Sequence, residues 1–576
     1  MSKEPDILLE DVSFVYQGSE QPALDGINLR IKPGEIVMLS GPAGAGKTTL
    51  CQMLNGLVPH FFRGTMKGTV EVQGNNTAQH TIAFLSHRVG LLFQDPASQL
   101  IAPTVNEEIA FGAENYGVPR EEIFERVDRF RKLVRLDQYA ESSPHRLSGG
   151  EQQACGIAAV MAMDPDIYVL DEPTSNLDPI GSQRVLDLIT QMVREEKKTM
   201  LIVEHKMEEM LPIVDRLIIL NEGKIILEGT PRELLHNVQT MEQIGLKPPQ
   251  VALLASRIDS NRIGSDLPLT LDEGIKAFKP LLKKGDGEPN RIGSKKTVKV
   301  GEEIIRTEKL WHVYEEGSVQ ALRGVDVSVK AGEFVGLIGQ NGSGKTTLVK
   351  HFNGLLRPTY GDIWVMGDNT QDKTIAQLST QIGYVFQNPD FQICCQSVKD
   401  ELEFGPKNLK LHEEEIDRRR DEVAEIFGFD KRYDEKPFSL SKGERQQLAV
   451  ASVLAMRPEV LIVDEPTTGQ DFKTGKEMMD FYRRLNEGGK TIIIITHDMN
   501  LAAEYCNRIV VLRKGRILMD GPVREVYSQS ETLARSFLRP PQITRFGQAM
   551  KDYGLPIDAL NVDEMFDYVS KSLGGS

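Results

Sequence analysis

Short apolar runs alternate with longer amphipathic stretches along this chain, and the whole pattern occurs twice. Residues 36–39 and 491–496 have the length and the branched apolar composition of buried parallel strands. Residues 120–134 and 412–427 are rich in charge but carry apolar residues at helical spacing, so we expect helices there. Strands that alternate with helices predict an α/β fold with a mainly parallel sheet in each half.

A glycine-rich sequence follows an apolar run and precedes a predicted helix in each half. The copies read Gly41-Pro42-Ala43-Gly44-Ala45-Gly46-Lys47-Thr48 and Gly339-Gln340-Asn341-Gly342-Ser343-Gly344-Lys345-Thr346. Both fit the phosphate-binding loop, in which backbone N–H groups and the lysine hold a polyphosphate and the threonine hydroxyl binds Mg²⁺. A chance glycine-rich turn is the alternative, but two copies in the same setting favour two nucleotide sites. The first helix is expected over 48–57.

Two adjacent carboxylates end an apolar strand in each half. They are Asp171-Glu172 and Asp464-Glu465, each followed by proline. An aspartate beside the phosphate-loop threonine can hold Mg²⁺ through hard oxygen ligands, and the glutamate can polarise or deprotonate an attacking water. The same acids could merely cap a strand end, but the phosphate loops upstream favour the catalytic interpretation.

The sequences Leu147-Ser148-Gly149-Gly150-Glu151 and Leu440-Ser441-Lys442-Gly443-Glu444 precede those strands. They resemble the signature of ATP-binding cassette (ABC) ATPases. The resemblance implies two tandem P-loop domains, each with a mainly parallel sheet core, an antiparallel β subdomain and a helical subdomain. In the family, the signature serine and a helix N-terminus meet the γ-phosphate that the opposite domain holds. Lys442 departs from the glycine usual in the family, which leaves the relative activity of the two sites open.

The resemblance extends to residues that the family uses around ATP. It implies ATP and Mg²⁺ as cofactors, and hydrolysis of ATP to ADP and phosphate. Glutamine near the nucleotide could also be a surface residue, histidine a structural one and tyrosine a strand aromatic. The implied sets are catalytic Glu172, Glu465, His205 and His497; metal-binding Thr48, Gln94, Asp171, Thr346, Gln387 and Asp464; D-loop Asp178 and Asp471; adenine-stacking Tyr16 and Tyr314; and Thr49 and Thr347 after the phosphate loops.

Domain boundaries follow from the repeat. We expect ABC ATPase domains over 1–235 and 301–530, with appendices over 236–300 and 531–576. Residues 248–284 echo 540–574, and both begin with Pro-Pro-Gln, which indicates a pair of small elements for packing or oligomerisation. Residues 283–299 are rich in glycine, lysine and serine, a composition typical of an exposed linker.

Bulk composition limits the classes of function. The formal charge of −15 argues against broad, nonspecific nucleic-acid binding. The five cysteines are scattered, without paired metal-ligand spacing, which favours reduced structural thiols. Because no apolar run approaches the roughly 20 residues that span a bilayer, any membrane role requires another chain.

Segments after Gln94 and Gln387, which the resemblance places in the Q-loops of the family, make the resemblance more specific. Asp95-Pro96-Ala97-Ser98-Gln99 and Asn388-Pro389-Asp390-Phe391-Gln392, each followed by a segment ending in Phe-Gly, resemble the ATPases of energy-coupling factor importers. The resemblance implies a peripheral protein on the cytoplasmic face of the membrane, with a transmembrane T-component and a substrate-binding S-component. Each ATP site would be composite, one between 41–48 and 440–444 and the other between 339–346 and 147–151. An ATPase of another ABC transporter and a soluble twin-cassette translation factor are the alternatives.

Overall fold

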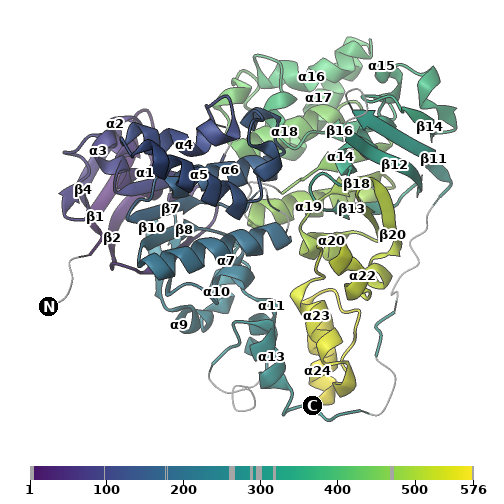
Figure 1. The fold of residues 1–576 in the computed structure, drawn as a ribbon. Helices are drawn as coiled ribbons and strands as arrows, with labels where there is room; N and C mark the ends of the chain where they lie inside the picture. Colours follow the sequence, from purple (N-terminus) through teal and green to yellow (C-terminus); the bar gives the residue numbers. More distant parts are fainter. Residues whose placement is uncertain are drawn as a thin grey trace.

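The structure is a computed structural model that describes residues 5–95, 98–175, 177, 179–258, 266–285, 290–293, 301–314, 319–467 and 472–573. Figure 1 shows two similar halves beside each other, with a smaller helical unit below them. That unit contains helices from both halves: α11 (Gln250–Ser256), α13 (Leu271–Phe278), α23 (Gln542–Ala549) and α24 (Val562–Ser572). Within the described residues, no helix is both long enough and apolar enough to cross a membrane.

A six-stranded sheet forms the centre of each half. The first has the order β10-β9-β3-β8-β7-β6 and the second β16-β17-β18-β13-β19-β20. All neighbours are parallel except the last hairpin of each half. The strands are β3 (Ile36–Ser40), β6 (Val89–Leu92), β7 (Ile167–Asp171), β8 (Thr199–Val203), β9 (Arg216–Asn221), β10 (Lys224–Gly229), β13 (Phe334–Gly339), β16 (Ile382–Val385), β17 (Val460–Asp464), β18 (Thr491–Ile495), β19 (Arg508–Arg513) and β20 (Arg516–Pro522).

An antiparallel sheet covers one face of each central sheet, with the orders β2-β1-β4-β5 and β12-β11-β14-β15. In the first half, a single apolar core contains Phe14 of the antiparallel sheet and Leu39 of the central sheet. The alternating apolar residues of each antiparallel strand therefore have one buried face. The strands are β1 (Ile7–Tyr16), β2 (Leu24–Ile31), β4 (Gly64–Val72), β5 (Asn75–Asn76), β11 (Glu303–Tyr314), β12 (Val319–Lys330), β14 (Tyr360–Val365) and β15 (Asp368–Asn369).

Helices form the remaining layer and a separate helical subdomain. The predicted charged helices are confirmed as α5 (Arg120–Leu133) and α17 (Glu413–Phe427), which pack with their neighbours α4 (Val105–Asn115), α6 (Gly149–Ala162), α16 (Val398–Asn408) and α18 (Lys442–Leu454). The helix expected over 48–57 is α1 (Lys47–Leu54), and its counterpart is α14 (Lys345–Phe352). Helices α7 (Pro179–Glu196) and α19 (Phe472–Glu487) follow the carboxylate-bearing strands. The predicted α/β fold with these subdomains is thus confirmed.

The two C-terminal appendices share one apolar core. Phe278 from the first appendix and Phe546 from the second are fully buried, with ring centroids 5.2 Å apart. Gln542 accepts a hydrogen bond from the Val251 N–H, and Gln250 accepts one from the Ile543 N–H, both at 2.9 Å. Since the two glutamines end the repeated Pro-Pro-Gln sequences, this contact has the reciprocal form of a two-fold interface. Short helices lead into the unit: α9 (Pro231–Leu235), α10 (Val238–Gln243), α21 (Val523–Tyr527) and α22 (Ser530–Arg535).

The described residues of the predicted linker, 283–285 and 290–293, are exposed except for the half-buried Ile292. Residues 283–285 are exposed, but the Asn290 amide donates a 2.7 Å hydrogen bond to the Gly554 carbonyl. The Ile292 N–H donates to the Asp558 carboxylate at 2.9 Å, and the Ile292 side chain packs against the appendix core. The chain is therefore tied to the second appendix at residues 290–293, which composition alone did not reveal.

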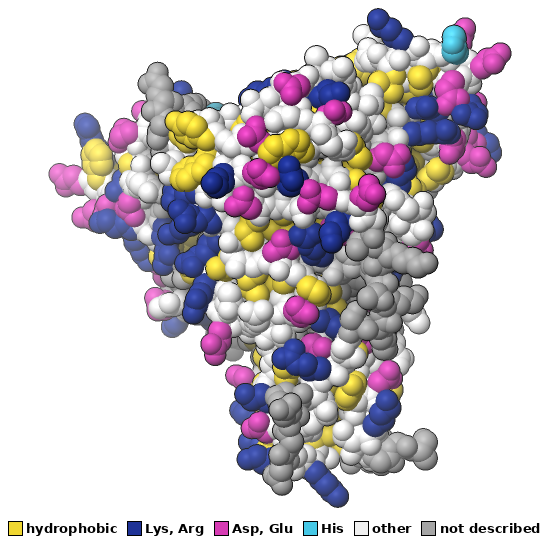
Figure 2. Space-filling model, turned by 90° about the vertical axis from the view of Figure 1, so that its right-hand side faces the viewer, with side chains coloured by type: hydrophobic (Ala, Val, Ile, Leu, Met, Phe, Trp, Pro, Cys, Tyr) yellow, Lys and Arg dark blue, Asp and Glu magenta, His cyan; other side chains and the backbone are white. Residues whose placement is uncertain are grey.

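Acidic and basic side chains are mixed over most of the face that Figure 2 shows, with apolar groups between them. Such a surface matches a formal charge of −15 that is spread over many residues of both signs. The exposed apolar side chains include equivalent phenylalanines of the two halves, Phe111 and Phe404.

Candidate functional site

The phosphate loops lie where the first parallel strand of each half meets its helix. Gly41, in the first loop, has a φ of 151°, and a Cβ there would meet the Leu220 carbonyl oxygen at 2.1 Å. Gly339 is the equivalent residue, with a φ of 153° and the Leu512 carbonyl oxygen at 2.3 Å. Only glycine fits these two positions, because the loop backbone passes so close to the neighbouring strand.

The two phosphate-loop lysines are held at the N-termini of their helices. The Lys47 ammonium donates to the carbonyls of Gly41 and Pro42 at 2.7 and 2.8 Å. The Lys345 ammonium donates to the carbonyls of Gly339 and Gln340 at 2.8 and 3.0 Å. Each positive charge therefore lies against its phosphate loop at a helix N-terminus, a position suited to binding polyphosphate.

A threonine hydroxyl and an aspartate meet beside each loop. The Thr48 hydroxyl donates to the Asp171 carboxylate at 2.7 Å, and the Thr346 hydroxyl donates to the Asp464 carboxylate at 2.9 Å. Both aspartates are 3 % exposed. Burial, followed by the charge of Glu172, raises the pKa of Asp171 to about 6 although Thr48 opposes the shift. These hard oxygen donors fit Mg²⁺, which would supply the positive charge that offsets the buried carboxylate.

The second half adds a phenol to its aspartate. The Tyr384 hydroxyl donates to Asp464 at 2.9 Å, whereas Leu91 is the equivalent residue of the first half. Burial, followed by the charge of Asp464, raises the pKa of Tyr384, so the phenol stays protonated and remains a donor. Tyr384 is not among the predicted site residues, although a polar side chain inside an otherwise apolar strand was a signal for it.

The neighbouring glutamates adopt a strained backbone. Glu172 and Glu465 have φ values of 49° and 50°, in the left-handed region that side chains other than glycine rarely adopt. Their N–H groups still donate to the adjacent strand, at the carbonyls of Val203 and Ile495. Strained backbone of this kind is frequent at functional sites.

Each glutamate contacts the predicted catalytic histidine of its own half. His205 Nε2 lies 3.2 Å from Glu172, and His497 Nδ1 lies 2.8 Å from Glu465. Burial favours the neutral form of Glu172, but the hydrogen bond and charge of His205, together with Lys47 and Gln94, lower its pKa. An ionised carboxylate can accept a proton from water at neutral pH.

Charged residues from one appendix reach the segment after the histidine of the opposite half. The Lys247 ammonium lies 3.2 Å from Asp498, which directly follows His497. In the reciprocal direction, Arg545 forms an ion pair with Glu208, three residues after His205. We call these two ion pairs the cross-braces. They depend on tertiary structure, and the sequence offered no signal for them.

The predicted adenine-stacking tyrosines lie at equivalent positions in the two halves. The Tyr16 and Tyr314 hydroxyls lie 2.9 and 3.2 Å from the hydroxyls of Thr49 and Thr347. Each ring is thus held beside its phosphate loop. Gln94 contacts Glu172, whereas Gln387 is exposed at the end of β16.

The signature serines occupy equivalent helix ends in the two halves. Ser148 and Ser441 are exposed N-caps of α6 and α18, each within a capping box with Glu151 or Glu444. Lys442 is the first residue of α18 and is exposed. Asp178 and Asp471 lie outside the described residues.

The fold and these residues together define a P-loop ATPase with two nucleotide-binding halves in one chain. The ABC transporter family matches residues 24–175 and 322–468. An ABC transporter ATP-binding protein of Caldanaerobacter subterraneus is 43 % identical over 97 % of this chain and 98 % of its own length. One of Methanosarcina mazei is 38 % identical over 98 % of this chain and 97 % of its own. The chain therefore belongs to the ABC transporter ATP-binding family, whose members bind and hydrolyse ATP.

A solved structure also shows similarity to part of the chain. The CbiO1 protein of Clostridium perfringens, described as part of the CbiONQ transporter complex, is 36 % identical. The match covers 43 % of this chain and 99 % of that protein, with a TM-score of 0.38.

Proposed function

We propose that this chain is the ATP-hydrolysing subunit of a membrane importer of the energy-coupling factor type, which takes up a vitamin or a transition-metal ion. The observation that carries the proposal is the reciprocal pairing of the two appendices through Gln250 and Gln542. This pairing resembles the dimerising extensions of such importers. The paired appendices belong to two halves of one chain, and each half contains one set of ATP-site residues. The second ATPase domain that a single-domain subunit would need from a partner is therefore already present.

Each ATP site is composite in this proposal. The loop at 41–48 works with the signature at 440–444, and the loop at 339–346 works with that at 147–151. Ser148 and Ser441 support the pairing, because both are exposed at a helix N-terminus where a phosphate can be bound. Asp178 and Asp471 would contribute from the D-loops.

Hydrolysis in each site uses the strained glutamate. Glu172 accepts a proton from the attacking water, while His205 holds the carboxylate from 3.2 Å. Lys47 neutralises phosphate charge as the bond to the γ-phosphate breaks. Thr48, Asp171 and Gln94 would hold Mg²⁺, which would supply further positive charge. In the second half Glu465, His497, Lys345, Thr346, Asp464 and Gln387 take the same roles.

The membrane partners would dock near the Q-loops. Phe111 on α4 and Phe404 on α16 are equivalent residues, 43 % and 49 % exposed, and Phe391 beside the second Q-loop is 81 % exposed. Two matching apolar side chains on the surface favour a partner that contacts both halves alike. We assign this role to coupling helices of a transmembrane T-component, which would place the chain on the cytoplasmic face of the membrane. A separate S-component would bind the substrate.

Single-site hydrolysis tests the composite sites. In a Glu465→Gln background only the Lys47 site turns over, and we expect Ser441→Arg to lower its rate by about 10²-fold, the order of magnitude for one lost transition-state contact. Ser148→Arg is the matched control and leaves that rate unchanged. The reverse pattern, with Ser148→Arg alone inactivating the Lys47 site, would contradict the pairing. Full hydrolysis in the Glu172→Gln, Glu465→Gln double variant would contradict the catalytic assignment.

Purification from detergent-solubilised membranes tests the partner. We expect a T-component to copurify with the wild-type chain and to be lost from the Phe111→Asp, Phe404→Asp double variant. Tyr360→Asp, in the antiparallel sheet and 69 % exposed, is the matched control and keeps the partner. Copurifying ribosomal particles would instead favour a translation factor, and subunits of an unrelated permease would favour another ABC transporter.

A further inference from the structure

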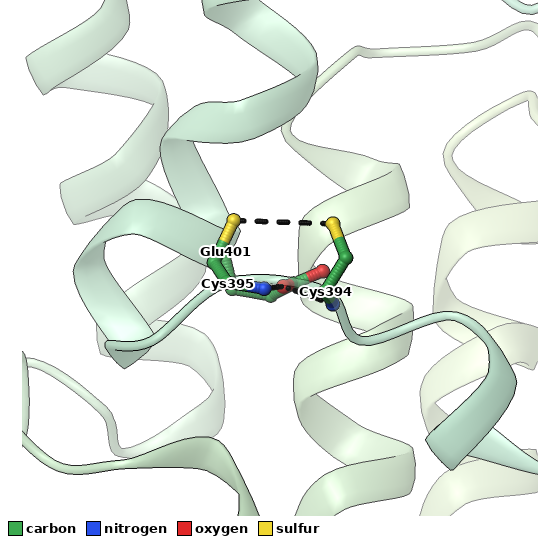
Figure 3. A group of neighbouring side chains, drawn as sticks. All are labelled: Cys394, Cys395 and Glu401. Atoms are coloured by element: carbon green, nitrogen blue, oxygen red, sulfur yellow. Dashed lines mark hydrogen bonds between the residues drawn. The ribbon is translucent and has the colours of Figure 1, made fainter.

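Two adjacent thiols lie between the second Q-loop and α16. Cys394 is exposed and Cys395 is half-buried, whereas the other three cysteines, Cys51, Cys155 and Cys506, are buried. The sulfur atoms of Cys394 and Cys395 are 4.0 Å apart. Figure 3 shows both thiols on the same side of the loop, with Glu401 of α16 next to them. The pair is therefore open to solvent and already directed toward a common point.

Glu401 fixes the backbone beneath the two thiols. One of its carboxylate oxygens accepts hydrogen bonds from the N–H groups of Cys394 and Cys395, at 3.0 and 2.9 Å. One ligand atom from each of the three residues can be chosen so that all lie within 4.8 Å of one another. The carboxylate is 3 % exposed, so its orientation is set by packing and by these hydrogen bonds.

The first half contains the same support without the sulfur atoms. There Glu108 accepts hydrogen bonds from the N–H groups of Ile101 and Ala102, at 2.8 and 2.7 Å. The loop conformation therefore does not require cysteine, since an isoleucine and an alanine occupy the equivalent positions. The two thiols are a chemical addition to a shared scaffold, and the structural role of the loop does not account for them.

The distance between the sulfur atoms suits a metal chelate. Zinc–thiolate bonds of about 2.3 Å at a tetrahedral angle place two sulfur atoms about 3.8 Å apart. Thiolate ligands select soft or borderline ions, and a carboxylate oxygen is a common further ligand of zinc. We propose that Cys394, Cys395 and Glu401 bind one thiophilic divalent ion of the zinc class, with solvent completing its coordination.

Binding replaces the thiol protons. Burial, and next the charge of Glu401, raise the pKa of Cys395 to about 12, so this thiol is protonated at neutral pH. An incoming divalent ion bonds to both sulfur atoms and releases their two protons to solvent. No electrons are transferred, and no oxidant is needed.

The ion would tie the Q-loop to the helical subdomain. The Gln392 side chain accepts a hydrogen bond from the Phe386 N–H at 3.1 Å and donates one to the Ala449 carbonyl at 2.8 Å. The segment is thus anchored next to Gln387 at one end and to α18, while Glu401 anchors its other end to α16. A bound ion would fix the chain between these anchors in one conformation.

Cadmium titration of the reduced, purified full-length chain tests the site, because cadmium–thiolate bonds give an ultraviolet charge-transfer band. We expect one Cd²⁺ per chain to produce the band in the wild type. The Cys394→Ile, Cys395→Ala variant, which carries the residues of the first half, should lose it. The reverse graft, Ile101→Cys with Ala102→Cys, should bind two Cd²⁺ ions per chain, since Glu108 already supports that loop.

Circular dichroism without metal confirms that each variant is folded. Persistence of the full band in the Cys394→Ile, Cys395→Ala variant would assign it to the buried cysteines and overturn the proposal. So would the absence of a band in the reduced wild type. Glu401→Gln, whose amide oxygen can still accept the two N–H groups, should weaken cadmium binding, whereas the matched Glu108→Gln should leave it unchanged. Equal affinity in both would remove Glu401 from the ligand set.

Discussion

Removing Lys247 tests whether the first appendix stabilises the segment that follows His497 in the second half. Its ammonium lies 3.2 Å from Asp498, and the two side chains are 34 % and 29 % exposed. Asp498 also caps α20 (Met499–Tyr505) by accepting hydrogen bonds from the N–H groups of Asn500 and Leu501, at 2.9 and 3.1 Å. A partly exposed ion pair of this kind contributes about 1 kcal/mol, the upper end of the range for surface pairs.

We therefore expect Lys247→Met to increase the local opening of α20 about fivefold, the factor that corresponds to about 1 kcal/mol. Hydrogen exchange, followed by mass spectrometry on the peptide spanning 498–505, measures this opening directly. The α8 segment (Met207–Met210) belongs to the other cross-brace and should exchange as in the wild type. Arg545→Met should give the opposite pattern, with faster exchange in α8 and none of the effect in α20.

A double-mutant cycle isolates the ion pair from other effects of losing Lys247. Asp498→Asn removes the charge but keeps a side chain that caps helices well. If this cross-brace stabilises α20 through its ion pair, the coupling free energy between Lys247→Met and Asp498→Asn is about 1 kcal/mol. A coupling energy within about 0.3 kcal/mol of zero would refute the role of this ion pair, because independent sites deviate from additivity by about that amount. Equal acceleration of α8 and α20 by Lys247→Met would indicate general loosening instead.

Three further perturbations test other parts of the structure. Burial lowers the pKa of His351 to about 4. The unfolded chain therefore takes up this proton near pH 6.5, and the native chain only near pH 4. The free energy of unfolding falls by up to about 3 kcal/mol as the pH drops from about 6.5 to about 4. His351→Met, which installs the Met53 of the first half, should reduce this acid-side fall in melting temperature; an unchanged fall would exclude His351 as its source. Phe546→Ala should cost about 3–5 kcal/mol and deprotect both α11 and α23 in hydrogen exchange, whereas deprotection of α23 alone would contradict the shared core. In a Lys345→Ala background, Gly41→Ala should abolish binding of a fluorescent ATP analogue at the first site. Gly44→Ala should only weaken this binding, because a Cβ there meets nothing within 4 Å. Equal effects of the two substitutions would reject the steric argument.

Local sequence was sufficient to predict much of the fold and the position of each phosphate loop. The glycine spacing, the helix after the first phosphate loop and the strand ending in Asp171 depend on short-range backbone rules. The structure contains both elements, although the helix expected over 48–57 runs from Lys47 to Leu54. The helix over 120–134 was equally predictable because its apolar face repeats at helical spacing. The roles of these residues in ATP hydrolysis stay a prediction.

Contacts between distant residues were beyond the sequence. The cross-brace from Lys247 to Asp498 joins residues of different halves, and no local pattern links them. The appendices were recognisable as a repeat, but their common core depends on Phe278 and Phe546 meeting in three dimensions. Tyr384 donates its hydroxyl to Asp464, a residue 80 positions later, so this contact too depends on the folded chain.

The two halves place different chemistry around similar site residues. In the second half, His312 and the buried His351 lie 3.1 Å apart beneath Tyr314, where the first half has Phe14 and Met53. Among the residues that the structure describes, a phenol donates to the aspartate in the second half and in none of the equivalent contacts of the first. Under the proposed pairing, the exposed cation of Lys442 would face the phosphate held by Lys47, and the other site would meet Gly149 there. Since charge at the transferred phosphate governs the barrier, the sites should hydrolyse ATP at unequal rates even though both contain the glutamate and histidine.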